Sequence, residues 1–223
     1  PAAARPRSAR RSADAARMTA GPALVDAIAD GLAGPGWAIA PDFVPHGLVA
    51  TLAAALDAKL ASGELREAAV GAGARRAVRP EIRGDLIQWL AGEGSAAERE
   101  MLTRLDALRV ALNGALQLGL HELECHYASY PPGACYTRHL DRSPAGVERV
   151  VSVVLYLNPG WHADDGGELR LYAPSGAVDV APHGGTLAAF LSERLEHEVR
   201  PAVRPRRSLT GWFRRRPVGG PLA

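Results

Sequence analysis

Residues 121–141 of this 223-residue chain are HELECHYASYPPGACYTRHLD, two strand-like segments on either side of a turn with two prolines and a glycine. Further segments of strand length follow at close spacing, separated by Gly, Pro and Asp and without an intervening helix. The expected strands are 121–130, 135–141, 149–157, 167–172, 177–180, 185–191, 196–200 and 206–213. Short strands in close succession indicate an antiparallel sandwich or barrel.

The first half of the chain is different because its periodic segments are helical. Apolar residues recur at helical spacing in three segments, 23–32, 45–60 and 95–118. Ser95 and Glu98 form the capping-box pattern expected at the start of the third helix. A short strand is expected at 37–40, whereas residues 66–82 have no clear period and are predicted to be loop. We therefore predict an α+β fold in which N-terminal helices pack on a β-barrel.

The length of the chain fits one domain of barrel or sandwich size, or at most two small ones. We expect four parts: a tail at 1–17, a helical part at 22–118, a barrel core at 119–214 and a tail at 217–223. The helical part and the barrel core belong to a single domain over 18–216. Residues 1–17 are either a disordered tail or sequence upstream of a start at Met18.

The formal net charge of +2 is unevenly distributed. Residues 1–17 contain five arginines and one aspartate, so the remaining chain has 21 basic and 23 acidic residues and a net charge of −2. This balance argues against a nucleic-acid-binding domain. Two cysteines are too few for a disulfide scaffold, and no apolar run approaches the ~18–20 residues of a membrane span. Because the N-terminus also lacks the apolar core of a signal peptide, we expect a soluble, cytoplasmic protein.

Two histidines and an aspartate in the barrel segments form a candidate metal site. His139 and Asp141 are separated by one residue, so on a strand both side chains point to the same face. His197 supplies a second imidazole from a later strand. Two histidines and one carboxylate are the ligand set that holds non-haem Fe(II) and leaves coordination positions open. The short pattern H-x-D alone equally fits a histidine at a strand end beside a turn aspartate, so the third ligand carries the prediction.

An arginine on the last expected strand offers an anchor for a carboxylate. The residues that share one face of this strand are Arg206, Ser208, Thr210 and Trp212. An arginine that faces the inside of a barrel is costly unless it meets an anion. A guanidinium beside a hydroxyl suits a carboxylate, and Tyr156 on a preceding strand would supply a further donor. The barrel thus combines a metal site with a carboxylate anchor.

Five segments of the chain, taken with their spacing, form a pattern that is far less common by chance than H-x-D alone. They are Tyr130-Pro131-Pro132-Gly133, His139-Leu140-Asp141, Val154-Leu155-Tyr156-Leu157-Asn158, Gly166-Gly167-Glu168-Leu169-Arg170, and His197-Glu198-Val199 followed by Arg206 and Ser208. Together with the upstream segment IRGDLIQW at 82–89, they resemble the Fe(II)/2-oxoglutarate oxygenases. Within these enzymes the sequence is most similar to the prolyl 4-hydroxylase group, which includes the hypoxia-sensing prolyl hydroxylases and their bacterial relatives. The resemblance covers about residues 32–213.

This resemblance implies a double-stranded β-helix and a defined reaction. Enzymes of the family couple oxidative decarboxylation of 2-oxoglutarate, to succinate and CO₂, with hydroxylation of a C–H bond by O₂. Fe(II) would be held by His139, Asp141 and His197, and no further catalytic residue is implied. Asp141 favours a hydroxylase, because the related halogenases lack this carboxylate.

The resemblance also assigns the co-substrate and substrate residues. Arg206 would pair with the distal carboxylate of 2-oxoglutarate, and Tyr156 would donate a hydrogen bond to it. Tyr130, Ser208 and Thr210 are expected along the same co-substrate pocket. The residues expected near the substrate or in the pocket wall are Arg149, Leu169 and Trp212.

His126 departs from the family pattern, in which the matching position is usually apolar. It shares a strand face with Tyr130, so we expect it to line the co-substrate pocket without ligating the metal. The alternative is a hydrogen-bonded interior histidine with no catalytic part.

Charged residues flank the expected pocket. Arg83, Arg138, Arg142 and Arg149 favour weak contact with a partner of acidic or carbonyl-rich character. Arg83 either pairs with Asp85 or borders the substrate channel.

The leading hypothesis is a dioxygenase that hydroxylates a prolyl residue of a protein or peptide, with ascorbate as reductant. Elongation factor Tu, a target of bacterial relatives, is the first candidate partner. The prolyl target rests on the resemblance alone, so a free amino acid, another side chain or a small metabolite stays open. Other classes are a 2-oxoglutarate or oxygen sensor with little turnover and a cupin-like metalloenzyme that uses no 2-oxoglutarate. Arg206, Ser208 and Tyr156 together argue against the last.

Overall fold

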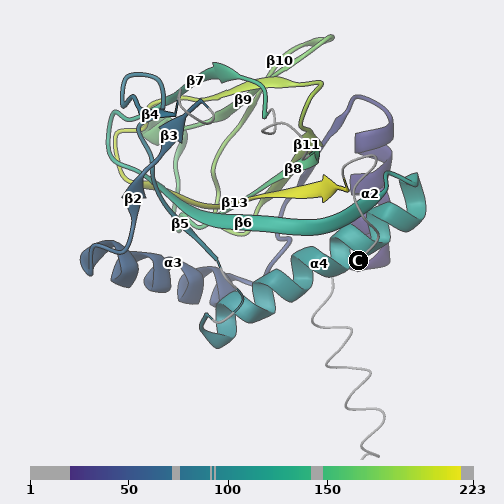
Figure 1. Cartoon of the computed structure of the whole chain (residues 1–223), viewed down its shortest axis with the longest axis horizontal. Coiled ribbons are helices and arrows are strands. Elements are labelled where there is room, and N and C mark those ends of the chain that lie inside the picture. The colour runs from purple at the N-terminus through teal and green to yellow at the C-terminus, as the bar shows by residue number, and fades with distance from the viewer. Residues whose placement is uncertain (1–20, 72–75, 91, 93, 142–147, 217–223) are drawn as a thin grey trace, which may run out of the picture.

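The computed structural model describes residues 21–71, 76–90, 92, 94–141 and 148–216 (Figure 1). Its helices are α2 (Pro22–Ala33), α3 (His46–Ala61), α4 (Ala96–Leu116) and the short 3₁₀ helix η2 (Ala163–Asp165). Residues 1–17, Met18, Arg142 and 217–223, on which predictions were made above, lie outside the described residues. None of the described helices is long and apolar enough to cross a membrane.

The strands form two main sheets and one small ribbon. The strands are β1 (Trp37–Ala40), β2 (Arg66–Glu67), β3 (Ala69–Val70), β4 (Ala77–Val78), β5 (Leu86–Trp89), β6 (Leu120–Tyr130), β7 (Tyr136–His139), β8 (Glu148–Tyr156), β9 (Leu169–Ala173), β10 (Gly176–Val180), β11 (Leu187–Leu191), β12 (Glu196–Val199) and β13 (Arg206–Arg215). The larger sheet has the order β1-β11-β8-β13-β6-β5-β2, the smaller one β10-β9-β12-β7, and β3 pairs with β4. All of these pairings are antiparallel, as in a double-stranded β-helix, so the predicted fold class is confirmed.

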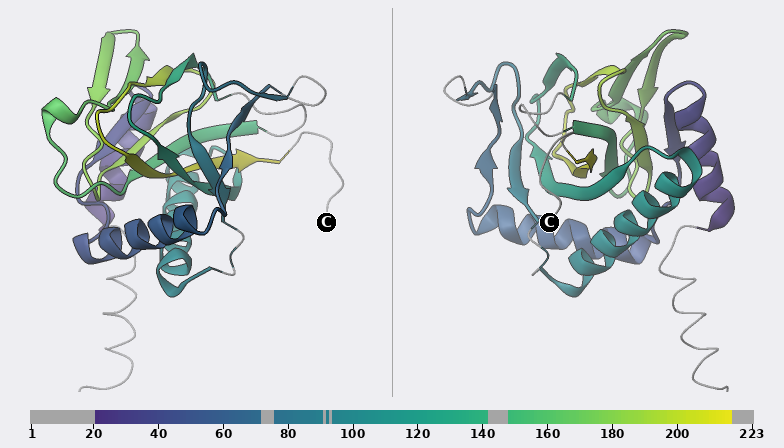
Figure 2. Two further views of the ribbon diagram at one scale, coloured as in Figure 1. Left: turned by 90° about the vertical axis from the view of Figure 1, so that its left-hand side faces the viewer. Right: turned by 45° about the vertical axis from the view of Figure 1, so that its right-hand side comes forward.

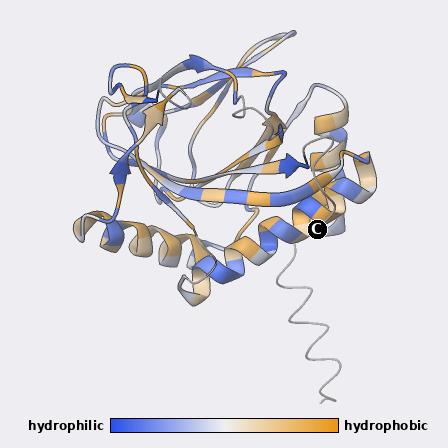
Figure 3. Ribbon diagram, in the orientation of Figure 1, coloured by the Kyte–Doolittle hydropathy of each residue, from blue (hydrophilic) through white to orange (hydrophobic). Residues whose placement is uncertain are grey.

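The two faces of the larger sheet bury different partners. Helices α3 and α4 lie on one side of it and the smaller sheet on the other (Figures 1 and 2). Along β6, Cys125 and Tyr127 pack with the helices, whereas Ala128 and Tyr130 pack between the two sheets. Hydrophilic and hydrophobic residues are interspersed along this strand (Figure 3). The period of two therefore places His126 on the inner side, as predicted.

Helix α4 begins at the predicted capping box. The Ser95 hydroxyl accepts a hydrogen bond from the backbone N–H of Glu98 at 3.2 Å, and the Glu98 carboxylate accepts one from the backbone N–H of Ser95. These two bonds satisfy backbone donors that have no partner within the helix. The helix ends at Leu116 and is followed by the C-cap residue Gln117, which has a left-handed φ of 53°.

The prediction of a loop over residues 66–82 was wrong. Strands β2, β3 and β4 lie in this segment, and β5 follows it. Strands of two residues are too short to show a period, and pairing with β6 rather than local preference defines β5. The barrel therefore includes strands from the part expected to be helical. This difference concerns the site directly, because Trp89 of β5 lies opposite His126 of β6.

Candidate active site

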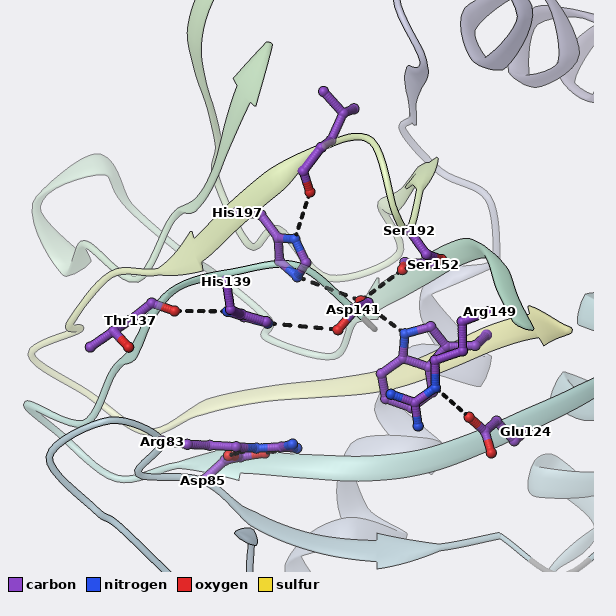
Figure 4. A network of polar contacts seen from close by, with 12 residues as sticks. Arg83, Asp85, Glu124, Thr137, His139, Asp141, Arg149, Ser152, Ser192 and His197 are labelled. Carbon is purple, nitrogen blue, oxygen red and sulfur yellow. Dashed lines mark hydrogen bonds and ion pairs between the residues drawn. The ribbon is translucent and has the colours of Figure 1, made fainter. Parts of the chain in front are cut away.

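The three predicted metal ligands come together between β7 and β12. His139 ends β7 and lies directly opposite His197 of β12, while Asp141 follows β7 by two residues. The Asp141 carboxylate oxygens lie 3.6 Å from Nε2 of His139 and 3.5 Å from Nε2 of His197 (Figure 4). All three ligand atoms lie within 4.8 Å of one another. The geometry fits a single ion with free coordination positions.

Backbone carbonyls orient both imidazoles. Nδ1 of His139 lies 2.7 Å from the carbonyl oxygen of Thr137, and Nδ1 of His197 lies 3.1 Å from that of Leu195 (Figure 4). A carbonyl only accepts hydrogen bonds, so the proton of each ring belongs on Nδ1. Each Nε2 then directs a lone pair toward the ligand cluster, which is how histidines in metal sites are commonly held.

Two donors hold the Asp141 carboxylate in place. Its Oδ2 accepts hydrogen bonds from the Ser152 hydroxyl at 2.7 Å and from Nε1 of Trp212 at 2.8 Å. Ser152 in turn lies 2.9 Å from the Ser192 hydroxyl. Ser152 and Trp212 face each other in the β8/β13 register, so one pair of neighbouring strands supplies both donors. Neither contact was predicted.

The electrostatics of the cluster suit a cation. Burial alone would raise the pKa of Asp141, but the His197 and His139 imidazoles and the Ser152 hydroxyl outweigh it and hold that pKa well below its ordinary value. Burial lowers the pKa of His197 to about 4, against the opposing pull of Asp141. At neutral pH the carboxylate is charged and the His197 ring is neutral, as metal ligation requires.

Arg206 lies at the end of the pocket away from Trp212 and is almost completely buried. Its Nε donates to the carbonyl oxygen of Gly167 at 2.8 Å, whereas Nη2 has no hydrogen-bond partner among the described residues. Its Cζ lies 5.3 Å from the Tyr130 ring centroid and 5.2 Å from that of Tyr156. The buried Tyr156 hydroxyl has no described partner either. Unsatisfied buried donors are costly, and a carboxylate would satisfy both.

A narrow cavity of about 40 Å³ connects the ligand cluster with Arg206. Its wall contains five of the other residues predicted for the co-substrate or substrate: His126, Tyr130, Leu169, Thr210 and Trp212. Ser208 and Tyr156 are buried opposite each other in the β8/β13 register, outside the wall itself. Arg149 is also outside it and lies 3.6 Å above the Trp212 ring.

The arginines around the pocket are paired with carboxylates. Arg83 contacts Asp85 through two hydrogen bonds of 2.8 and 3.1 Å, and both residues also line the cavity. Of the two alternatives for this pair, the ion pair is observed, and a role at the border of the substrate channel stays a prediction. Arg138 pairs with Glu196, and Arg149 with Glu124 at 2.6 Å. These ion pairs offset the charges of the three described arginines among the four predicted for this rim.

We expect Trp212→Phe to weaken metal binding by about ten-fold, because loss of a hydrogen bond to a metal ligand commonly costs 10–100-fold in affinity. Phenylalanine keeps an aromatic face for Arg149 but cannot donate to Asp141. Trp161→Phe is the matched control, since it removes an indole hydrogen bond to the Gly166 carbonyl instead. Calorimetry with Mn(II) measures the effect. Equal affinities of the two variants would contradict a role for Trp212 in holding Asp141.

We also expect the metal-free protein to lose stability as the pH falls from about 7 to about 4. The pKa of His197 is lowered to about 4 and that of His126 to about 3, in both cases mainly by burial. In the unfolded chain both titrate near 6.5. Below that pH the unfolded state binds protons that the folded state does not, so each histidine lowers the free energy of unfolding by up to about 1.4 kcal/mol per pH unit. Thermal melts across this range test the prediction. An unchanged melting temperature between about pH 7 and about pH 5 would refute it.

The fold, the ligand cluster and the buried arginine together define an Fe(II)- and 2-oxoglutarate-dependent oxygenase. The family model of the 2OG-Fe(II) oxygenase superfamily matches residues 125–214, and the chain belongs to this superfamily. Within it, the chain is 47% identical to a Pseudomonas putida prolyl-4-hydroxylase of known structure, with a TM-score of 0.80 over 86% of this chain and all of that one.

Animal prolyl hydroxylases are also similar. A Trichoplax adhaerens prolyl hydroxylase, solved with a peptide fragment of the oxygen degradation domain of hypoxia inducible factor, is 28% identical with a TM-score of 0.75. The match covers 94% of this chain and 93% of that one. Mouse prolyl hydroxylase EGLN3 is 35% identical over 68% of this chain and 67% of its own length. Human Egl nine homolog 1 is 35% identical over 60% of this chain, but the match spans only 33% of that longer protein.

Proposed function

We propose that the protein is a 2-oxoglutarate-dependent dioxygenase that hydroxylates a prolyl residue of a protein or peptide, with succinate and CO₂ as co-products. The single observation that carries this proposal is the buried Arg206, whose Nη2 has no described partner, in the same cavity as His139, Asp141 and His197. The prolyl target is supported by the similarity to the Pseudomonas putida and Trichoplax adhaerens enzymes.

The ligand cluster would hold Fe(II), which when bound supplies the activation of O₂ needed to hydroxylate a C–H bond. His139 and His197 each present Nε2 because a carbonyl fixes the proton on Nδ1. Asp141 is held in its orientation because Ser152 and Trp212 donate hydrogen bonds to it. These residues therefore preorganise three ligands in a largely buried site.

Arg206 and Tyr156 would bind the distal carboxylate of 2-oxoglutarate. The guanidinium contributes charge and a free Nη2, and the hydroxyl contributes a second donor. With this end fixed, the co-substrate would reach toward the ligand cluster, since Arg206, Thr210 and the three ligands line the same cavity. The buried apolar side chains of Leu169 and Phe190 line the same cavity.

For the substrate, we propose recognition by shape and hydrogen bonding rather than by a strong positive field. The carboxylate partners of Arg83 and Arg149 offset their charges at the pocket. A prolyl ring in a loop of a folded protein is compatible with the narrow cavity, and elongation factor Tu is the first protein to test. Arg149 would contact the substrate beside Trp212, over which its guanidinium lies.

The test is hydroxylation itself. Purified protein is incubated in air with Fe(II), 2-oxoglutarate and ascorbate, with prolyl peptides or elongation factor Tu added, and succinate and peptide mass are measured. We expect succinate to form in proportion to a gain of one oxygen atom on proline. If succinate formation were equally coupled to hydroxylation of a free amino acid or a metabolite, that compound would replace the prolyl residue as the proposed substrate. Binding of 2-oxoglutarate without turnover on any substrate would favour the sensor.

A further inference from the structure

His126 is a buried polar side chain with an unmet hydrogen bond in the co-substrate cavity. It is 1% exposed and lines the cavity, and its Nδ1 has no hydrogen-bond partner among the described residues. The Trp89 ring lies 4.8 Å away edge-on, and the Trp212 ring lies 5.3 Å away. Buried polar groups in folded proteins almost always have partners, so this nitrogen indicates a ligand that completes the site.

The ring is a neutral donor and acceptor rather than a cation. Burial, with the Arg83 and Arg149 guanidinium groups, lowers the pKa of His126 to about 3. At neutral pH the imidazole therefore carries one N–H donor and one lone pair. It lies outside the group of three side chains that can share one metal ion. Its free N–H is thus available to a hydrogen-bond acceptor in the cavity.

The register of β6 and β13 places His126 at the metal end of the cavity. Tyr130 lies opposite Arg206, and four residues back along β6 His126 lies opposite Thr210. That separation is about 13 Å along a strand. The indole of Trp212, which flanks His126, donates to the metal ligand Asp141. Arg206 and His126 therefore stand at opposite ends of the same pocket.

We propose that the His126 imidazole donates a hydrogen bond to the carboxylate of 2-oxoglutarate that adjoins its keto group. This inference rests on the proposed function, because it takes the distal carboxylate to be bound by Arg206. The adjoining carboxylate then enters the end of the pocket where His126 and Thr210 face each other across β6 and β13. A carboxylate is the strongest acceptor that a 2-oxoglutarate molecule brings to this end.

Replacing His126 by leucine is expected to keep or raise the thermal stability of the protein and to lower its affinity for 2-oxoglutarate. His126→Leu removes a buried nitrogen without a partner and keeps an apolar side chain against Trp89 and Trp212. The ligand-free variant should therefore melt at the same temperature as the wild type or higher. Its dissociation constant for 2-oxoglutarate should rise by at least about ten-fold, as expected for loss of a hydrogen bond to a charged group. A purely structural histidine would give lower stability and unchanged affinity.

The experiment is calorimetric titration of 2-oxoglutarate into Mn(II)-loaded protein without oxygen, which separates binding from turnover. His126→Asn and His126→Gln retain an amide donor near the positions of Nδ1 and Nε2, and at least one should bind 2-oxoglutarate more tightly than His126→Leu. His121→Leu is the matched control, because His121 is exposed on the same strand. It should bind like the wild type.

The outcomes separate this inference from the proposed function. One outcome is that Arg206→Ala abolishes 2-oxoglutarate binding while the dissociation constant of His126→Leu stays within about two-fold of the wild-type value. That outcome would refute the role of His126 and support the proposed co-substrate site. The same holds if His126→Leu raises only the KM for a peptide. If Arg206→Ala also binds normally, the proposed co-substrate site is itself wrong.

Discussion

Arg206→Ala is expected to abolish turnover and to weaken binding of 2-oxoglutarate by at least about 100-fold. Hydrogen bonds to charged groups contribute roughly 1.5–3 kcal/mol each, and alanine removes both the charge and the free Nη2. The Tyr156 hydroxyl remains as a donor. Without the guanidinium, however, one hydroxyl does not offset the cost of removing the 2-oxoglutarate carboxylate from water. Titration of the Mn(II)-loaded protein measures the affinity directly.

Arg207→Ala is the control for this substitution. Arg207 is the next residue on β13, faces the opposite side of the strand and pairs with Asp57 of α3. It has the same charge, so any general effect of removing an arginine from this strand appears in both variants. Unchanged 2-oxoglutarate binding in Arg206→Ala would show that the co-substrate carboxylate is held elsewhere.

The barrel could be predicted from the sequence because its signals are local. Every strand expected after residue 119 occurs, because the segments are short and are separated by turn residues such as Gly, Pro and Asp. The same alternation placed His126 on the inner face from its distance to Tyr130. The segment 66–89 carries no such signal, because its strands are short and are defined by their neighbours.

The ligands could be predicted, whereas the residues that hold them could not. The residue types and spacing of two histidines and an aspartate indicate a metal site directly from the sequence. The contact of Ser152 and Trp212 with Asp141 depends on the alignment of β8 with β13, which no single segment encodes. For this reason Trp212 was expected only in the pocket wall, and its hydrogen bond to a metal ligand was missed.

The unsatisfied groups are visible only in the structure. A sequence shows that Arg206 and His126 face inward, but not which of their nitrogen atoms find partners. The Gly167 carbonyl takes the Nε of Arg206 and leaves Nη2 free. The structure thus shows that Nη2 is the atom available to a ligand. The sequence indicated only that Arg206 would favour an anion, whereas the structure shows where that anion would bind.

Asp141→Ala is expected to abolish hydroxylation and to weaken metal binding by several orders of magnitude. The carboxylate is the anionic member of the ligand cluster, in which the other two residues are histidines. Its removal leaves two imidazoles for a divalent cation and strands the Ser152 hydroxyl and the Trp212 indole N–H without their acceptor. Both the charge and the geometry of the site are therefore lost.

Metal titration with Co(II) or Mn(II) separates this effect from a failure to fold. Asp164→Ala is the control, because Asp164 is an exposed aspartate on η2 outside the ligand cluster. Alanine in place of Asp141 leaves two buried donors without an acceptor, so the metal-free variant should melt at a lower temperature than the wild type, and its melting curve shows whether it folds. It should also keep the hydrogen-bond donors of Arg206 and Tyr156. A variant that folds and binds Mn(II) as tightly as the wild type would show that the ion is held by other residues, and the assignment of the site would have to be abandoned.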